Sequence, residues 1–131
     1  MLHMQLGLLR IQQRRYDEAI HELKTAVELA ERSTETLAAL ATGYAASGDI
    51  TNAKTILNEL EKPAAKRYVL PLNIAKIYVA MGDAEKAFMW LETSYKEGNP
   101  DLIELNSEPV FDGIRADPRF IELMRRVGWR V

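Results

Sequence analysis

The side chains that could carry out chemistry are few in this sequence, and their spacing favours no reaction. Its two histidines, His3 and His21, belong to no metal-binding pattern such as HExxH. We expect both to be surface histidines, with His21 on an exposed helix face beside Glu22. Because the sequence contains no cysteine, it offers no thiolate nucleophile, no disulfide and no cysteine-rich zinc site.

The acidic residues and the glycines form no catalytic or nucleotide-binding motif either. The carboxylate pairs Asp17/Glu18 and Glu59/Glu61 have lysines or amides nearby, as expected for solvated helix faces rather than for acid–base catalysis. The glycines are scattered, so no loop is rich enough in glycine to cradle a phosphate. We therefore expect a protein that is not an enzyme and that holds no metal and no cofactor.

Size and charge indicate a single soluble domain. The chain has 131 residues, 47% of them hydrophobic, and a net charge of −2, which argues against extensive nucleic-acid binding. No apolar run approaches the ~20 residues that span a bilayer. The start, MLHMQLGLLRIQQRR, lacks the order of charged and apolar residues that marks a signal peptide. Since the absence of cysteine fits a reducing compartment, we expect a cytoplasmic protein without membrane or nucleic-acid contacts.

A period of 34 residues runs through the chain and indicates stacked helical hairpins. Two helices pack closely only where their side chains are small, so the small residues that recur should face one another within each hairpin. Leucines that recur with the same step should fill the space beside these contacts. The recurring residues are Gly7, Ala41 and Ala75; Ala19, Ala53 and Ala87; Leu6, Leu40 and Ile74; Leu23, Leu57 and Leu91; and the turns Gly48-Asp49 and Gly82-Asp83.

The period predicts an all-α fold, an α–α superhelix of three helical hairpins followed by a degenerate C-terminal capping segment. We expect the hairpins over about 1–33, 34–67 and 68–99, and the cap over 100–131. The first helices are predicted over 2–13, 34–47 and 71–81, and the second helices over 16–31, 50–61 and 84–97.

Glycines and prolines set the ends of these helices. Gly48 and Gly82 suit the left-handed position that ends a helix, and the aspartate after each can cap the next helix. Pro63 should stop a second helix, because proline cannot continue the hydrogen-bond ladder. Residues 62–70 would then form the longest internal connection, and Pro71 would be the first residue of its helix.

The motifs LG followed by YDEAI, LA–Y–GD–A and IA–Y–MGD–A, one in each hairpin, resemble the tetratricopeptide repeat. The resemblance covers about residues 1–99 and implies a curved solenoid that works as a protein-binding scaffold. The departures from the pattern are Arg10 in place of an aromatic residue, Arg14-Arg15 in place of Gly-Asp, Leu60 in place of a small residue, and Pro71 near the start of a first helix.

The C-terminal segment continues the period weakly and is typical of a cap over the end of the stack. Asp117 and Pro118 should begin a helix near 118–127, which Gly128 can end, with Trp129 folding back near Met124. The apolar face of this helix carries Phe120, Leu123, Met124 and Val127.

The partner of this last helix is interrupted by Pro109 and Gly113. We expect a short helix near 101–107 and an irregular stretch PVFDGIR after it. From Ala87 to Trp129 the wording also resembles the C-terminal end of many bacterial tetratricopeptide proteins. In those proteins the repeats follow a winged-helix transcriptional activator, a Ser/Thr kinase or a nucleotide cyclase, so the resemblance implies a part of a longer regulator.

Two groups of arginines give local positive charge. Near the C-terminus, the end of a helix favours cations in any case, and an acidic partner is the alternative explanation. The second group is expected to face solvent. The two groups are Arg115, Arg119, Arg125, Arg126 and Arg130, and Arg10, Arg14 and Arg15.

The tetratricopeptide resemblance also implies where a ligand would bind, because the first helix of each hairpin lines the concave face. The implied groove is largely apolar and suits an amphipathic helix or an extended apolar segment of a protein partner. Of the polar residues that clamp a peptide carboxylate in this family, only Asn73 and Lys76 have counterparts, so that clamp is not expected. The groove positions are Met4, Leu8, Ile11, Ala38, Thr42, Ala45, Leu72, Asn73, Lys76 and Val79.

Three alternatives stay open for these apolar residues. The chain's own C-terminal segment could cover them, upstream repeats could, or a second copy of the chain could in a homodimer. The segment could equally be a regulatory or oligomerisation module within a larger bacterial transcriptional regulator or kinase.

Overall fold

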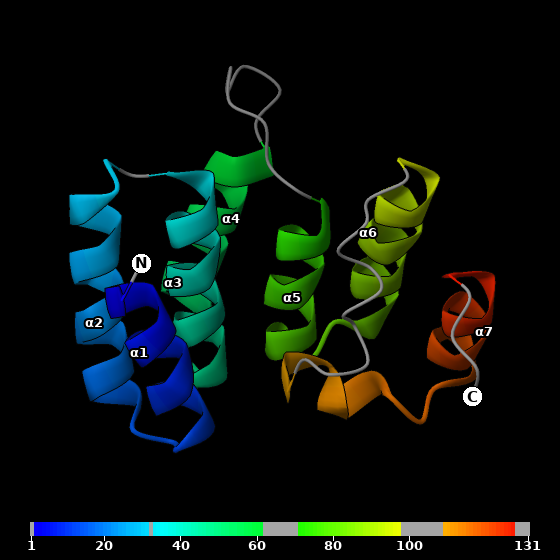
Figure 1. Cartoon of the computed structure of the whole chain (residues 1–131), viewed down its shortest axis with the longest axis horizontal. Coiled ribbons are helices and arrows are strands. Elements are labelled where there is room, and N and C mark those ends of the chain that lie inside the picture. Colours follow the sequence, from blue (N-terminus) through cyan, green and yellow to red (C-terminus); the bar gives the residue numbers. More distant parts are fainter. Residues whose placement is uncertain (1, 32, 62–70, 98–108, 128–131) are drawn as a thin grey trace. The chain divides into compact units, whose positions relative to one another are not determined.

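A computed structural model describes residues 2–31, 33–61, 71–97 and 109–127 of the chain. Throughout these residues the regular elements are helices, which confirms the prediction of an all-α helical-repeat fold. The chain divides into two compact units, Met1–Val69 and Leu70–Val131, each with its own packed helices (Figure 1).

The helices lie within two residues of the predicted bounds. In the N-terminal unit each helix packs against its neighbour in the sequence, and α1 also contacts α3 (Figure 1). In the C-terminal unit α5 contacts α6 and η2, and α6 contacts α7. The helices are α1 (Leu2–Gln12), α2 (Tyr16–Leu29), α3 (Thr34–Ala46), α4 (Ile50–Glu61), α5 (Pro71–Met81), α6 (Ala84–Lys96), the 3₁₀ helix η2 (Pro109–Ile114) and α7 (Pro118–Val127).

The small residues of the 34-residue period lie where helices approach most closely. Ala19, Ala53 and Ala87 have no exposed surface. A methyl group added at Gly7 would lie 2.5 Å from Cγ of Leu23, so only glycine fits there without a shift. The predicted contact between the small residues of the paired helices is therefore confirmed in the first hairpin.

The recurring leucines fill the space beside these contacts, as predicted. Leu23, Leu57 and Leu91 are buried. Leu40 and Ile74 are buried too, but Leu6, their equivalent on α1, is only half-buried. This position is therefore partly exposed on α1, whereas it is buried on α3 and α5.

The turn between the two helices of a hairpin has the same backbone three times. Arg14, Gly48 and Gly82 have φ of 60, 91 and 83°, and they are spaced by the repeat period. The next residue in each turn donates its N–H to the last turn of the preceding helix, with N–O distances of 2.9, 2.8 and 2.9 Å. This is the hydrogen bond of a Schellman-type helix end. The first hairpin therefore forms the glycine turn with an arginine in the left-handed position.

In the second and third hairpins, the aspartate after the turn caps the helix that follows. Oδ1 of Asp49 accepts a hydrogen bond from N–H of Asn52 at 3.2 Å, and Oδ1 of Asp83 accepts one from Lys86 at 3.1 Å. Arg15, which replaces the aspartate in the first hairpin, makes no such side-chain bond. The predicted capping roles of Asp49 and Asp83 are confirmed.

The stretch predicted as irregular, PVFDGIR, instead forms the 3₁₀ helix η2. The reason is a period of three: a 3₁₀ helix places residues three apart on one side. Phe111 and Ile114 have this spacing, and both are buried in the core of the C-terminal unit. Proline at the first position costs no hydrogen bond, since the first N–H groups of a helix have no internal partner.

The last helix begins and packs as predicted. α7 starts at Pro118, after Asp117, whose Oδ1 accepts the N–H of Arg119 at 2.9 Å. Its apolar face, Phe120, Leu123 and Met124, is buried. The predicted helix near 101–107, the stop at Pro63 and the fold-back of Gly128-Trp129 lie outside the described residues, although α4 does end at Glu61 and α5 does begin at Pro71.

Candidate protein-interaction surfaces

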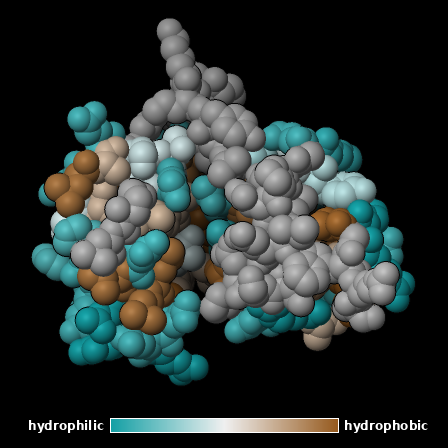
Figure 2. All heavy atoms as spheres, viewed as in Figure 1, coloured by the Kyte–Doolittle hydropathy of each residue, from teal (hydrophilic) through white to brown (hydrophobic). Residues whose placement is uncertain are grey.

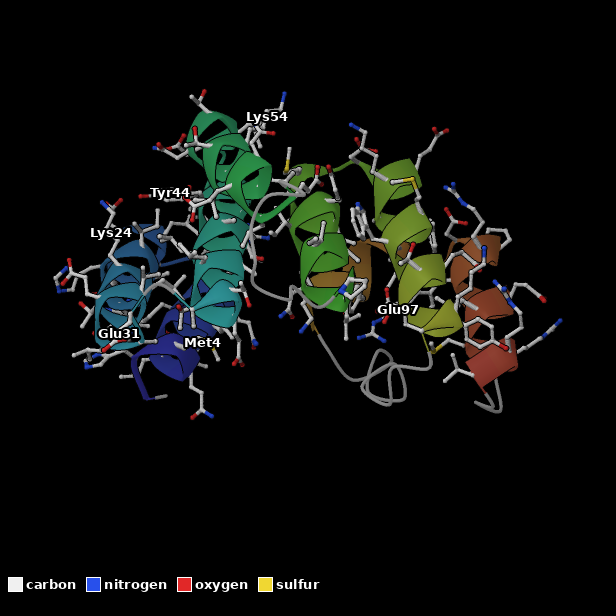
Figure 3. All side chains as sticks on the ribbon, turned by 90° about the horizontal axis from the view of Figure 1, so that it is seen from above. Met4, Lys24, Glu31, Tyr44, Lys54 and Glu97 are labelled. Atoms are coloured by element: carbon white, nitrogen blue, oxygen red, sulfur yellow. The ribbon has the colours of Figure 1, made fainter. Side chains whose placement is uncertain are left out.

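One predicted groove helix, α1, presents an apolar row with exposed surface. Met4, Leu8 and Ile11 lie three or four positions apart, so they share one face of the helix, and each is half-buried. Figure 2 shows hydrophobic residues gathered on the N-terminal unit over α1, and Figure 3 shows Met4 projecting from that helix. This row offers a ligand apolar side chains without unfolding the unit.

The predicted groove residues of α3 are smaller and more deeply placed. Ala38, Thr42 and Ala45 are all buried. The hydroxyl of Thr42 donates to the carbonyl oxygen of Ala38 at 2.9 Å, so its polar group is already satisfied within the helix. The α3 positions therefore offer a ligand little exposed surface and no polar recognition site.

The predicted groove residues of α5 differ in how deeply they are buried. Leu72 is only 3% exposed and belongs to the core cluster of the C-terminal unit, which also holds Phe111 and Phe120. Val79 packs against the same cluster, whereas Asn73 and Lys76 are half-buried. Within this unit the C-terminal segment thus packs with two of the apolar groove positions, which is one of the alternatives that the sequence left open.

Comparison with known families bears on the first part of the chain. Residues 10–70 match the family model of the tetratricopeptide repeat. This stretch is similar to the tetratricopeptide repeat and spans a little under half of the chain. Such repeats generally mediate contacts between proteins, so protein binding is the general role that the match supports. No curated protein and no solved structure gave a significant match to the chain.

The first hairpin contains a polar pair that the sequence analysis missed. Nδ1 of His3 lies 2.7 Å from Oε2 of Glu22, which joins α1 to α2. One repeat later the equivalent positions hold Leu37 and Ile56. Aligning the chain on its own period would have found the pair, because a histidine and a glutamate replace two apolar residues together.

The other histidine is where it was predicted to be. His21 is exposed on α2. Among the described residues, no group of three or more histidine, aspartate or glutamate side chains is placed to hold a metal ion. Likewise, none of the helices in the described segments combines the length and apolarity needed to cross a lipid bilayer.

The C-terminal arginines after the repeats are used largely within the chain. The guanidinium of Arg126 donates to both carboxylate oxygens of Glu92 and lies 5.2 Å from the ring centroid of Tyr95. Arg119 lies 4.5 Å from the ring centroid of Phe88 and bonds Asp117 at 2.9 Å. The contacts with Glu92, Tyr95 and Phe88 join α7 to α6. Nε of Arg115 also donates to Oδ1 of Asp112 at 2.8 Å. Three of the five arginines thus have partners within the chain.

The shifted pKa values belong to these same pairs. Hydrogen bonding to Arg126 lowers the pKa of Glu92, and hydrogen bonding to Arg119 lowers the pKa of Asp117. The pKa values of both arginines are raised for the reciprocal reason. All four groups are therefore held in their charged forms, which is the behaviour of structural ion pairs.

The arginines of the first repeat lie around the turn between α1 and α2. Nε of Arg15 is 2.7 Å from Oε2 of Glu18, and Nε of Arg10 is 3.8 Å from the same oxygen. Arg14 and Arg15 are exposed, as predicted, while Arg10 is half-buried. A single carboxylate in the first turn of α2 thus contacts two of these three cations.

Proposed function

We propose that the chain is a protein-interaction module that binds an apolar peptide or helix on the α1–α3 face of its N-terminal unit. The observation that carries the proposal is the half-buried row Met4, Leu8 and Ile11 on α1. Beside it lie the buried small residues of α3, whose one hydroxyl group is bonded internally. A row of this spacing fits the apolar side of an amphipathic helix or alternate side chains of an extended segment.

The apolar character of this face sets the class of ligand. The two polar candidates among the groove residues, Asn73 and Lys76, belong to α5 in the other unit. None of the predicted groove residues on α1 and α3 carries a charge. A peptide carboxylate would therefore find no cation on this face. We expect affinity to come from apolar burial and to depend little on salt.

A selection experiment tests the proposal. Peptides selected against the whole chain from a random displayed library would be titrated by fluorescence anisotropy against the parent and against Leu8→Glu. Burying an unpaired carboxylate should weaken binding by at least roughly tenfold. Leu29→Glu is the matched control, because Leu29 is 70% exposed at the end of α2 and is not part of the row on α1. Equal loss in both variants, or none in either, would contradict the proposed face.

The design avoids α5 for a structural reason. Leu72→Glu would place a carboxylate in the core of the C-terminal unit, where Leu72 is buried among aromatic side chains. Loss of binding by that variant would report unfolding and not loss of contact. Leu8 is half-buried, so its replacement is compatible with a folded unit, which circular dichroism would verify.

The second candidate is a regulatory or oligomerisation module of a larger bacterial regulator. It is favoured by the resemblance of residues 87–129 to the tails of such proteins. The most specific part of that wording, FDGIRADPRF, supplies buried side chains to the C-terminal unit, namely Phe111, Ile114 and Phe120. Reading the complete gene tests it: an effector domain in the same frame would support it, and a short independent gene would exclude it.

A non-enzymatic role in the bacterial cytoplasm is part of the proposal. It is supported by the perturbed groups, which are two arginine–carboxylate pairs: Arg126–Glu92 joins α7 to α6, and Arg119–Asp117 lies at the start of α7. Catalytic groups are more often perturbed in a cleft and without such a structural reason. Fractionation of cells that produce the chain from its own gene would test the location.

A further inference from the structure

The apolar surface of α1 extends to a second side, which the proposed peptide-binding row does not use. Leu9 is 45% exposed and Leu6 is half-buried, and they lie three positions apart on one face of the helix. The equivalent residues one repeat later, Gly43 and Leu40, are both buried. The same helix face is thus covered on α3 and open on α1 in the described residues.

On α3 this face is packed against helix α2. A methyl group added at Gly43 would lie 2.8 Å from Cδ1 of Leu23, so a leucine of α2 fits against the backbone of α3 at this point. Leu23 itself has no exposed surface. The α2–α3 contact therefore indicates which kind of element suits this face of a repeat: a helix with an apolar residue against the position equivalent to Leu9.

Positive charge at the C-terminal end of α1 adds a second requirement for a helix that docks on this face. Arg10, Arg14 and Arg15 stand at the positions that carry Tyr44, Gly48 and Asp49 one repeat later. The short turn between α2 and α3 makes the two helices antiparallel, so the first turn of α2 lies at the same end as the last turn of α3 (Figure 1). A helix that docked on α1 in the same way would bring its first turn toward these arginines.

The arginines select the sign of the charge in that turn. Acidic residues are favoured in the first turn of any helix by its dipole, and α2 itself has Asp17 and Glu18 there. Lysines or arginines in the docked turn would meet like charge. The arginines also replace a left-handed glycine and a capping aspartate, two substitutions that destabilise the isolated turn and that contacts with an acidic partner would offset.

We propose that the Leu6–Leu9 face of α1, together with Arg10 and Arg14, docks an amphipathic helix of another protein that carries acidic residues in its first turn. A second copy of this chain does not offer such a helix in its described residues. On α2, Ala19, Leu23, Ala26 and Val27 are buried in its own unit. The other exposed large hydrophobic residues, Leu29 and Met89, are single residues and not rows.

The test uses the whole chain and a designed probe. The probe is an acetylated 16-residue peptide with Asp-Glu-Glu in its first turn and leucines at every third or fourth position; its control has the same composition with the leucines distributed around the helix. Fluorescence anisotropy should give saturable binding of the probe, weakened at least roughly tenfold by Leu9→Lys. Leu29→Lys, the matched exposed leucine, should leave Kd within about twofold.

Two further variants examine the charge and separate this face from the proposed peptide-binding row. Arg10→Glu/Arg14→Glu should weaken the probe about tenfold at low salt and much less in 0.5 M NaCl, because exposed charges are screened. Leu8→Glu should leave the probe bound, since Leu8 belongs to the other row. This inference therefore stands or fails independently of the proposed function.

Several results would overturn the inference. Equal binding of the probe and the redistributed peptide would remove the requirement for a helical face. Unchanged Kd in Leu9→Lys, or no saturation up to 1 mM of the probe, would remove the docking site. If sedimentation without the probe showed a dimer that Leu9→Lys dissociates, the occupant would be a second copy. Leu9→Gln, which carries no charge, repeats each comparison should Leu9→Lys fail to fold.

Discussion

Helices α1 and α5 occupy equivalent places two repeats apart, yet only α5 has its apolar residues packed within its own unit. Leu72, equivalent to Met4, belongs to a core cluster with Phe111 and Phe120, whereas Met4 is half-buried. The difference arises from η2 and α7, which depart from the repeat and supply these two aromatic residues to the core around α5. The comparison teaches that an apolar helix face keeps exposed surface only where no later segment covers it.

The largest loss of stability is expected when an aromatic residue that η2 or α7 packs against α5 is removed. Phe111→Ala should destabilise the C-terminal unit by about 3–5 kcal/mol, because Phe111 is fully buried and its deletion leaves a cavity. Urea denaturation gives the total, and hydrogen exchange should show the loss in α5, α6 and α7. Leu9→Ala is the contrasting variant, expected to change the free energy of unfolding by under about 0.5 kcal/mol, since Leu9 is 45% exposed and is not one of the buried core residues of its unit. Comparable losses in the two would contradict the comparison of α1 with α5.

The turns of the first and later repeats should respond in opposite directions to exchange of glycine. Arg14→Gly should stabilise by about 1 kcal/mol, because a left-handed conformation strains a side chain with a Cβ atom. Gly48→Ala should destabilise by about 1 kcal/mol at the same turn position, where the added methyl group meets nothing within 4 Å and only the backbone is strained. Thermal unfolding of both variants measures this, and a destabilising Arg14→Gly would mean that the arginine makes a compensating contact.

The extent to which the sequence predicts this fold depends on the element. Helix bounds follow from the 34-residue step because small residues, leucines and Gly-Asp turns all recur in phase. The left-handed Arg14 is implied by that same step, although its residue type argues against it. The 3₁₀ helix η2 was missed because its apolar residues repeat every three positions, outside the pattern of the hairpins.

The candidate site is less predictable from sequence. Leu72 and Leu8 are both apolar at groove positions, and residue type cannot reveal that one of them packs with η2 and α7. The His3–Glu22 pair differs in this respect, since the 34-residue period reveals two polar residues at positions that are apolar one repeat later, and only the 2.7 Å contact between them needs the packed helices. Local patterns thus predict elements, whereas burial of a given side chain depends on which distant segment meets it.

A smaller effect should distinguish equivalent buried positions on the second helices. Ser94 is fully buried, and its hydroxyl has no hydrogen-bond partner in the described part of the chain. The first repeat has Ala26 at this position, also buried. Ser94→Ala should therefore stabilise by about 1 kcal/mol, because an unsatisfied buried hydroxyl is removed. Chemical denaturation with Ala26→Ser as the reverse variant, expected to destabilise, checks the equivalence.

The ion pair between α6 and α7 should contribute least, and only above acidic pH. Hydrogen bonding to Arg126 lowers the pKa of Glu92 in the folded state, so the unfolded chain takes up the proton first as pH falls. The stabilisation is present above the unfolded pKa of about 4.3 and is lost as pH falls through the lower folded pKa. Since the Glu92 side chain is 37% exposed, Glu92→Gln should cost under about 1 kcal/mol at pH 7.

That pH dependence separates the pair from simple packing of the arginine on Tyr95. The difference in unfolding free energy between the parent and Glu92→Gln should shrink toward zero as pH falls through the lowered pKa of folded Glu92, because the carboxylate then becomes protonated in the folded chain as well. A difference that persisted unchanged from pH 7 to pH 2 would show that Glu92 acts through its shape and not its charge. Because the arginine would keep its contact with the aromatic ring 5.2 Å away, α7 should stay docked in the variant. The C-terminal unit therefore depends on buried aromatic residues for most of its cohesion, with the arginines fixing how the last helix is oriented.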